Sequence, residues 1–588
     1  MAALDPELEL LLQYEPPQLA VRLLIDWSGT EADLVAKGVK LLAPVEDDTA
    51  MVELPLSVVA KLRGDPDIGY MELLPHFAPE LNVSRGVVNA PPSLGTGGFD
   101  GPTGEGVTIG IIDADMDVFH ESLRNPDGTS RVVALWDMHA ISKTARIDGL
   151  RAPEGFRTGL AYSKSDIDLA LSKPVTGEDK QTRKRREKLS GNLRMLRGNG
   201  HGTGVAGIAA GNGRSNSGAA ANIGIAPDAN LAVVVVRSLS DWAMAMRYLR
   251  RVMTGKPGVI NLSAGEHHGP HLPGGRVERW FGAFIEKSGI PLVKSAGNGG
   301  GSGGHATDVI KKGKGVSLQV LVQPGATKLT QQMRIQIWYG YGGGDPALAA
   351  TITPPGSTVA YDIPYGGTCA ASPSVIKASN RKRPDHLGLS AIGLRIKPQP
   401  GLWTVRLTAP KDKDVRFHAW IAWSASSTGE VSFATTGLVT DAASFTVPAA
   451  IPNLITVASF TTKDQSGNPT PDHKIATYSA HGPAADGVTP VITIAAPGQR
   501  ILTADPPDPT ATDPPPGKTD RYVLKNGTSF AAPHVTGAIA LMLEKEPLLT
   551  PAMIVAFLRK KPDTTLDPHI WGAGRLDIKK VLAEIGTA

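Results

Sequence analysis

The sequence is nearly devoid of cysteine, because Cys369 is the only one among 588 residues. No disulfide bond can therefore form within the chain. This cysteine content is compatible with a reducing compartment and offers no evidence of an oxidising one.

Long apolar runs are also absent from the sequence, and its first residues do not have the pattern of a signal peptide. No stretch approaches the roughly 18 uninterrupted apolar residues that a membrane-spanning helix requires. The N-terminal segment MAALDPELELLLQYEPPQ has no basic residues before its short apolar run LLL. We therefore expect a cytoplasmic protein with no membrane association, and leaderless export is the alternative.

Neither sign of charge is in large excess, since 60 Lys and Arg residues oppose 56 Asp and Glu residues. The net formal charge of +4 gives no reason to expect nucleic acid or a membrane surface as a partner. No cluster of Cys and His indicates zinc, and no acidic loop has the spacing of a strong calcium-binding motif. From the residues alone, we predict no metal site and no required cofactor.

Glycine and proline, in contrast, are abundant, with 66 and 47 residues, and 41% of the residues are hydrophobic. This composition indicates a loop-rich protein with a hydrophobic core, and the length predicts two or three folded units. Residues 20–78 show the pattern of three strands and two short helices, and so predict a small α/β unit within residues 1–88. The following residues, 89–106, have the composition of a linker.

Beyond the linker, near-continuous apolar segments alternate with helical patterns at 240–253 and 533–545. Such segments are typical of parallel strands that are buried on both faces of a sheet covered by helices. The predicted strands are VTIGIID (107–113), LAVVVVR (231–237), GVINLSAG (258–265), IPLVKSAGN (290–298), NLITVAS (453–459) and PVITIAAPG (490–498).

The pattern changes over residues 308–437, where short alternating strands are separated by Gly, Pro, Asp and Asn. This region predicts an antiparallel β-sandwich inserted into the α/β domain, which is thereby split into residues 89–307 and 438–588. The basic run DKQTRKRREK (179–188) predicts a solvated loop, with a site of proteolytic nicking as the alternative.

Four polar residues occupy suggestive positions, in the chain order Asp113, His201, Asn298 and Ser529. Asp113 and Asn298 lie at the ends of predicted strands, where open parallel sheets place their sites. His201 and Ser529 begin segments of small residues that predict helices. Each residue alone has a purely structural interpretation, as a turn residue or a helix cap. Together they supply a nucleophile, a base, an orienting carboxylate and an amide donor.

The segments around these residues resemble the subtilisin-like serine proteases. GHGTGVAGIAAG (200–211) and NGTSFAAPHVTGAIAL (526–541) match the family's His and Ser signatures nearly residue for residue, in the family's chain order. VINLSAG (259–265) looks like the family's substrate-binding strand, and IPLVKSAGN looks like its oxyanion segment. The likeness extends over about residues 105–300 and 440–585.

The resemblance implies a role for each of these residues. Ser529 would be the nucleophile, His201 the general base and Asp113 the carboxylate that orients the imidazole. Asn298 and the backbone N–H of Ser529 would bind the oxyanion, and the segment Ser263, Ala264 and Gly265 would pair with the substrate backbone. The implied function is a serine endopeptidase acting on proteins or peptides. The implied fold is a parallel sheet flanked by helices, and a structural Ca²⁺ ion is possible because relatives often bind one.

The sequence departs from the family pattern in three places. Asp115 stands where the family usually has glycine, and we expect it to face solvent. The intervals from Asp113 to His201 and from Asn298 to Ser529 are long, which resembles the subgroup with an inserted jelly-roll domain. Since the four site residues lie outside residues 308–437, we expect this insert to be separable from the chemistry.

Two alternatives stay open at this point. Residues 20–78 resemble an inhibitory pro-domain in size and strand–helix order, but an unrelated accessory module has the same pattern. The whole chain is interpreted as an active protease, with a catalytically silent binding or regulatory protein as the second hypothesis.

Overall fold

The computed structural model of the chain consists of two compact units. The smaller unit comprises Met1–Ala78 with Gln465–Gly467, and the larger comprises Pro79–Asp464 with Asn468–Ala588. Among the described helices, none is long and apolar enough to cross a membrane. The residues described by the structure are 3–4, 12, 16–18, 20–41, 49–74, 81–91, 93–95, 98–138, 140, 149–213, 222–237, 239–267, 269–324, 333–341, 343, 347–369, 376–383, 387–421, 431–463, 468–507 and 521–585.

The smaller unit is a sheet with two helices, and it has five strands, two more than the sequence predicts. Val21, Leu23, Ile25 and Trp27 are buried at alternate positions of one strand, so one face of the sheet forms the core. The strand order is β1 (Ala3–Leu4), β5 (Ile68–Leu74), β2 (Ala20–Trp27), β4 (Thr49–Pro55) and β3 (Lys40–Leu41), and the helices are α2 (Glu31–Ala36) and α3 (Leu56–Leu62).

The boundary of this unit lies at residue 78, earlier than the predicted residue 88. Helix α4 (Leu81–Val87) belongs to the larger unit, where the Ser84 hydroxyl lies 3.0 Å from His534 Nε2. The predicted linker, residues 89–106, includes the hairpin of β6 (Ser93–Gly95) and β7 (Gly98–Asp100). The backbone N–H groups of Thr103 and Gly104 both donate to Glu544, so this stretch is fastened to the larger unit.

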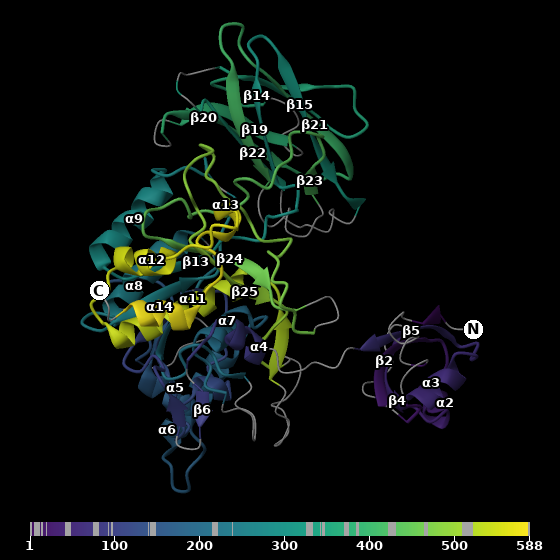
Figure 1. Ribbon diagram of the computed structural model, residues 1–588, viewed down its shortest axis with the longest axis vertical. Coiled ribbons are helices and arrows are strands. Elements are labelled where there is room, and N and C mark those ends of the chain that lie inside the picture. The colour runs from purple at the N-terminus through teal and green to yellow at the C-terminus, as the bar shows by residue number, and fades with distance from the viewer. Residues whose placement is uncertain are drawn as a thin grey trace. The chain divides into compact units, whose positions relative to one another are not determined.

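The larger unit is built on an eight-stranded sheet that contains all six predicted apolar strands (Figure 1). Neighbouring strands pair in parallel except β9 with β10 at one edge. The order is β10 (Leu160–Ser163), β9 (Val132–Asp137), β11 (Asn230–Val235), β8 (Thr108–Asp113), β12 (Gly258–Leu262), β13 (Leu292–Ser295), β24 (Ile455–Thr461) and β25 (Ile494–Gln499).

Helices cover both faces of this sheet, which explains why its strands are apolar throughout. In β11, Leu231 and Val233 alternate with Ala232 and Val234 between two separate hydrophobic clusters. One cluster contains α7 (His201–Ala210) and α11 (Thr528–Lys545), and the other contains α8 (Leu239–Val252) and α9 (Arg276–Ser288). Further helices are α5 (Lys164–Leu171), α12 (Pro551–Arg559), α13 (Pro568–Trp571) and α14 (Ile578–Glu584).

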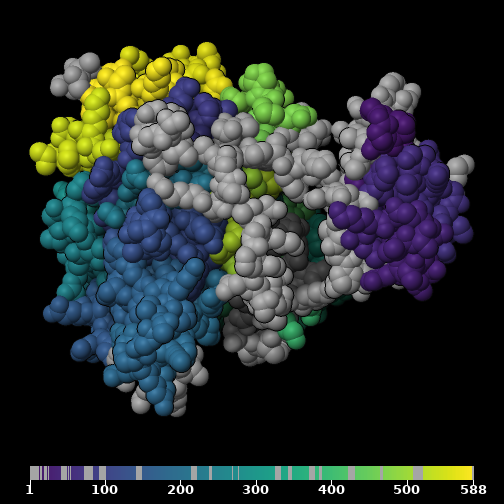
Figure 2. Space-filling model, turned by 90° about the horizontal axis from the view of Figure 1, so that it is seen from below, coloured from purple at the N-terminus to yellow at the C-terminus, as the bar shows by residue number. Residues whose placement is uncertain are grey.

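The basic segment 179–188 is not a loop, because it forms the first part of helix α6 (Lys180–Arg194). Asp179 caps this helix by accepting hydrogen bonds from the N–H groups of Gln181 and Thr182. Leu189 and Leu193 are buried on one side of it. The segment is therefore an amphipathic helix whose cations lie mostly on its exposed side, and this part of the chain is coloured blue in Figure 2.

The inserted region is an antiparallel sandwich of two five-stranded sheets whose inner faces share one hydrophobic core. The fold class expected from the sequence is thereby confirmed. The first sheet has the order β14 (His305–Ile310), β22 (Val415–Ile421), β16 (Met333–Tyr339), β20 (Leu389–Ile396) and β19 (Ile376–Arg383). The second has the order β18 (Tyr361–Ile363), β17 (Ala349–Thr353), β21 (Gly401–Thr408), β15 (Gly315–Val322) and β23 (Val431–Phe433).

The first sheet of the sandwich packs its outer face on the rest of the larger unit. Trp338 and Trp420 share a hydrophobic cluster with Phe445 and Val447. The indole N–H of Trp420 donates to the carbonyl oxygen of Ala443 at 3.0 Å. The insert is therefore joined to the helix-covered sheet by a buried interface as well as by its two chain connections.

Candidate active site

Asp113 and His201 form a hydrogen-bonded pair between the end of β8 and the start of α7. His201 Nδ1 lies 2.8 Å from Asp113 Oδ1 and 3.0 Å from Oδ2. Burial by itself lowers the pKa of His201, but the charge and hydrogen bond of Asp113 outweigh it and raise the pKa above its ordinary value. The carboxylate therefore orients the imidazole and stabilises its protonated form.

Gly202 allows this close approach of helix α7 to strand β8. A Cβ atom at Gly202 would lie 2.2 Å from the Asp115 carbonyl oxygen and 2.9 Å from the Asp113 Cβ. Any larger residue would push the helix away from the strand and lengthen the Asp113–His201 contact. The close packing of helix and strand therefore requires glycine at position 202.

Asp115 does not face solvent, contrary to the expectation from the sequence, because its side chain is buried against the start of α7. Its carboxylate oxygens accept hydrogen bonds from the backbone N–H groups of His201 and Gly202, at 3.1 and 3.0 Å. Burial and the neighbouring charge of Asp113 raise its pKa to about 6. The helix N-terminus, whose N–H groups have no partner within the helix, is what draws this carboxylate inward.

Ser529 lies in the first turn of α11, next to the end of strand β12. The ring of the following residue, Phe530, has its centroid 5.2 Å from that of His201. The Ser529 hydroxyl donates to the carbonyl oxygen of Ser263 at 3.2 Å, and the Ser263 hydroxyl donates to the carbonyl oxygen of Ser529 at 2.8 Å. This reciprocal pair fastens the start of α11 to the segment that follows β12.

Asn298 is held beside Ser529 by Thr528. Its Oδ1 atom accepts two hydrogen bonds at 2.8 Å, one from the backbone N–H and one from the hydroxyl of Thr528. The oxygen end of the amide is therefore occupied, and the Nδ2 end is left as the hydrogen-bond donor. Such an amide beside the Ser529 hydroxyl can donate to an oxygen that acquires negative charge there.

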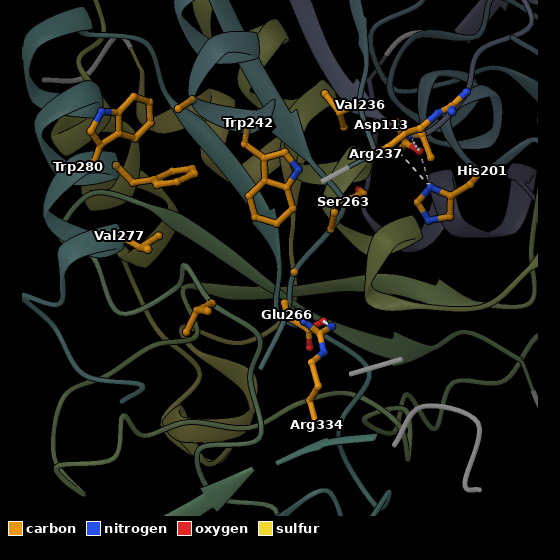
Figure 3. Close-up of a pocket in the computed structure, with 16 residues that line it drawn as sticks. Asp113, His201, Val236, Arg237, Trp242, Ser263, Glu266, Val277, Trp280 and Arg334 are labelled. Atoms are coloured by element: carbon orange, nitrogen blue, oxygen red, sulfur yellow. Dashed lines mark hydrogen bonds and ion pairs between the residues drawn. The ribbon is translucent and has the colours of Figure 1, made fainter. Parts of the chain in front are cut away.

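A cleft of about 930 Å³ runs from the Asp113–His201 pair along Ser263, Ala264 and Gly265 (Figure 3). One side of it is apolar, with the side chains of Trp242, Val277, Trp280 and Phe281. At another edge, Arg334 Nη2 lies 3.4 Å from Glu266 Oε2. The arrangement can bind an extended peptide, whose backbone would pair with the segment after β12 while apolar side chains enter the cleft.

Arg334 belongs to strand β16 of the inserted sandwich, so the insert lines the cleft. The neighbouring Gln336 accepts a hydrogen bond from the backbone N–H of Gly269 at 2.9 Å. The insert therefore contributes to the cleft, while its separability from the chemistry stays a prediction. The contribution has a geometric cause, because the outer face of the first sandwich sheet packs on the loop that continues from Gly265.

Within the described residues, no group of three or more His, Cys, Asp or Glu side chains is arranged to hold a metal ion. Calcium favours cages of carboxylate and carbonyl oxygens. The described side chains therefore do not form a carboxylate cage to which the possible structural Ca²⁺ could be assigned.

The profile of the subtilase family matches residues 104–330 and 418–574, which together make up more than half of the chain. The chain belongs to the subtilase family. Subtilisin-like protease SBT1.6 of Arabidopsis thaliana is 42% identical over 85 residues, which cover 14% of this chain and 11% of the relative. Serine protease AprX of Bacillus subtilis is 30% identical over 162 residues, which cover 26% of this chain and 35% of the relative.

Among solved structures, the CspB protease of Clostridium perfringens superposes on this subtilase with a TM-score of 0.60. The superposition covers 82% of this chain and 94% of that one, at 19% sequence identity, and so supports the fold. The matched segments span about a tenth of the length of the first curated relatives, 10%, 10% and 11%.

Sequence reasoning identified the residues that this structure of the subtilase brings together, but it missed several of their neighbours. Thr528 lies inside the quoted Ser motif, although nothing there signals that it orients Asn298. Lys294 does carry a signal in the sequence, because it is a charged residue within a predicted apolar strand. Arg334 carries no local signal, because it becomes part of the cleft only when the sandwich packs against the loop after Gly265.

Proposed function

We propose that this subtilase is a serine endopeptidase that hydrolyses peptide bonds in proteins and peptides through an acyl-enzyme. Ser529 is the nucleophile, His201 the general base and Asp113 the orienting carboxylate. Asn298 Nδ2 and the backbone N–H of Ser529 bind the oxyanion. Ser263, Ala264 and Gly265 pair with the substrate backbone.

The reaction follows from these roles in two halves. Ser529 Oγ attacks the scissile carbonyl carbon as His201 Nε2 takes the hydroxyl proton, and the carbonyl oxygen becomes an oxyanion. The intermediate collapses, the C–N bond breaks, and His201 returns the proton to the leaving amine. Water then attacks the acyl-enzyme with His201 again as base, which releases the carboxylic acid and regenerates Ser529.

The observation that supports this proposal is the Asp113–His201 hydrogen bond, together with the Asn298 amide, whose oxygen accepts a hydrogen bond from Thr528, the residue before Ser529. The pair sets the imidazole tautomer so that Nε2 is the free base. A binding protein without activity would have no need for this combination of an oriented base, a hydroxyl at a helix start and a directed donor.

An active-site-directed fluorophosphonate tests the proposal against the alternative of a silent binding protein. We expect covalent labelling of the wild-type chain at Ser529, and none in Ser529→Ala. Ser357→Ala, at a partly exposed position in the sandwich, is the matched control and should label normally. Peptidase activity should fall roughly 10⁴- to 10⁶-fold in Ser529→Ala, a range that includes measurements on subtilisin, a member of the family. A wild-type protein that neither labels nor cleaves would refute the proposal.

We also propose that the smaller unit is an inhibitory pro-domain. Its support is its compact fold, separate from the larger unit, and its strand–helix order. Tethering gives such a unit a high effective concentration at the cleft, so that even modest affinity inhibits. Cleavage should fall between β5, which ends at Leu74, and α4, which begins at Leu81.

N-terminal sequencing of the active protein decides this point. The wild-type chain should begin near the start of α4, whereas Ser529→Ala should remain full length. Adding back the fragment 1–78, which forms a compact unit by itself, should inhibit the cleaved enzyme. A fully active chain with an intact N-terminus would instead make the unit an accessory module.

A further inference from the structure

Lys294 is a charged residue inside the eight-stranded sheet, and the mechanism does not use it. It lies in β13, and its side chain is fully buried. Its ammonium group donates to the carbonyl oxygen of Ser295 at 2.6 Å and to the hydroxyl of Thr446 at 2.9 Å. Within the described part of the chain, no carboxylate forms an ion pair with it. A buried cation held by neutral groups alone costs free energy, so its retention at this place calls for a reason.

The partner of Lys294, Thr446, occupies the space between two backbone segments of the site. A Cβ atom added at Gly265 would lie 2.0 Å from Thr446 Oγ1, and one added at Gly297 would lie 2.9 Å from both Oγ1 and Cγ2. The backbone N–H of Thr446 donates to the carbonyl oxygen of Ala296 at 2.9 Å. Its side chain is therefore wedged between the segment 263–265 and the segment 296–298, and it is almost wholly buried.

This space matters because of where a substrate must lie if the proposed function holds. A peptide that pairs with Ser263–Gly265 and has its scissile carbonyl between Ser529 and Asn298 passes along the mouth of this space. Side chains of an extended peptide alternate in direction. The residue that supplies the scissile carbonyl then directs its side chain between the two segments, toward Thr446.

We propose that Thr446, anchored by Lys294, closes this space, so that the enzyme cleaves after glycine, alanine or serine. The hydrogen bond from the ammonium group holds the threonine hydroxyl in place, and the methyl group fills the remaining volume beside Gly297. Thr446 is thus a specificity-determining residue for the side chain next to the scissile bond. Lys294 is the positioning residue beneath it.

The closure has a second consequence for the buried ammonium group. If the threonine side chain is removed, Lys294 becomes the floor of an opened pocket. A glutamate side chain entering that pocket would accept a charge-assisted hydrogen bond from it, which glutamine would make more weakly. The selectivity of the opened variant therefore reports whether Lys294 lies beneath Thr446 in the working enzyme.

The experiment uses the purified wild-type protein in its active form and internally quenched peptides that differ only in the residue before the scissile bond: Ala, Gln, Glu or Phe. For the wild type, kcat/KM should be at least about tenfold higher after Ala than after the three larger residues, because overpacking a filled space is costly. Thr446→Gly should raise cleavage after Glu and Gln, with Glu favoured about tenfold. Thr446→Gly combined with Lys294→Met should abolish the preference for Glu over Gln. Thr436→Gly, at an exposed threonine, is the matched control and should leave the wild-type profile unchanged.

The possible results separate the inference from the function on which it rests. Wild-type cleavage after Phe, Glu or Gln at a rate within threefold of that after Ala would overturn the closure while leaving the protease function intact. Equal cleavage after Glu and Gln by Thr446→Gly would overturn the position assigned to Lys294. Failure to cleave any peptide, together with failure to label with fluorophosphonate, would refute the protease function itself.

Discussion

Replacing the buried Lys294 by methionine should stabilise the protein near neutral pH. Burial lowers the pKa of this lysine to about 7, against 10.5 for an exposed lysine. The unfolded chain therefore holds the proton between about pH 7 and 10.5, where the folded chain releases it. Because the unfolded state binds more protons in this window, the wild-type free energy of unfolding rises with pH across it.

The size of the effect follows from the same two values. Each pH unit between the folded and unfolded pKa values corresponds to about 1.4 kcal/mol in the free energy of unfolding. Burying the ammonium group therefore costs about 5 kcal/mol near neutral pH. Methionine removes this cost but leaves the Ser295 carbonyl and the Thr446 hydroxyl without their donor, a loss of about 2 kcal/mol. Lys294→Met should therefore be more stable than wild type by about 3 kcal/mol near pH 7, and less stable by about 2 kcal/mol near pH 10.5.

The assay is reversible urea unfolding, monitored by circular dichroism across this pH range, with Ser529→Ala in both chains to prevent autolysis. Lys314→Met, at an exposed lysine, is the matched control and should change stability by less than about 0.5 kcal/mol at any pH. A stability difference for Lys294→Met that does not depend on pH would refute the reasoning. It would mean that the ammonium group is neither desolvated nor costly.

Three further predictions concern the cleft. Asn298→Ala should lower kcat by about 10²- to 10³-fold with little change in KM, the range found for one such donor in subtilisin; a change in KM alone would place the amide in ground-state binding. Asp115→Asn removes a charge that raises the pKa of His201, so the acidic limb of the kcat/KM profile should move to lower pH; an unmoved limb would contradict this assignment. Arg334→Ala should change KM a few-fold and leave kcat unchanged, because the guanidinium lines the cleft away from the Asp113–His201 pair; an effect confined to kcat would be inconsistent with that position. Since its contact with Glu266 is exposed to water, stability should change by less than about 1 kcal/mol, as measured by urea unfolding.

Much of the fold was predictable because its signals are local. The buried strands of the eight-stranded sheet are continuous apolar runs, and the sandwich strands alternate, so both patterns can be read within six to eight residues. The residues Asp113, His201, Asn298 and Ser529 stand at the ends of such elements, within motifs of small residues. Their proximity follows once the strands are parallel, since the carboxyl ends of neighbouring strands meet at one edge.

The errors arose where a local pattern allowed two outcomes. The basic segment at 179–188 suggested a loop by its charge, although Asp179 as a cap and the later Leu189 and Leu193 stabilise a helix. Asp115 suggested an exposed side chain by its polarity. The unpaired N–H groups at the start of α7 provide the hydrogen bonds that let it be buried.

The amino-acid sequence by itself determined which segments become strands and helices, and which polar residues stand at their ends. Only the tertiary structure decided what surrounds those residues. Lys294 and Thr446 are 152 positions apart in the chain, and Ser263 and Ser529 are 266 apart. The contact of Arg334 with Glu266 depends on how an entire sandwich packs against a loop. Hydrophobic periodicity is set by neighbours within a few residues, whereas these contacts are set by the packing of distant surfaces, which no local pattern encodes.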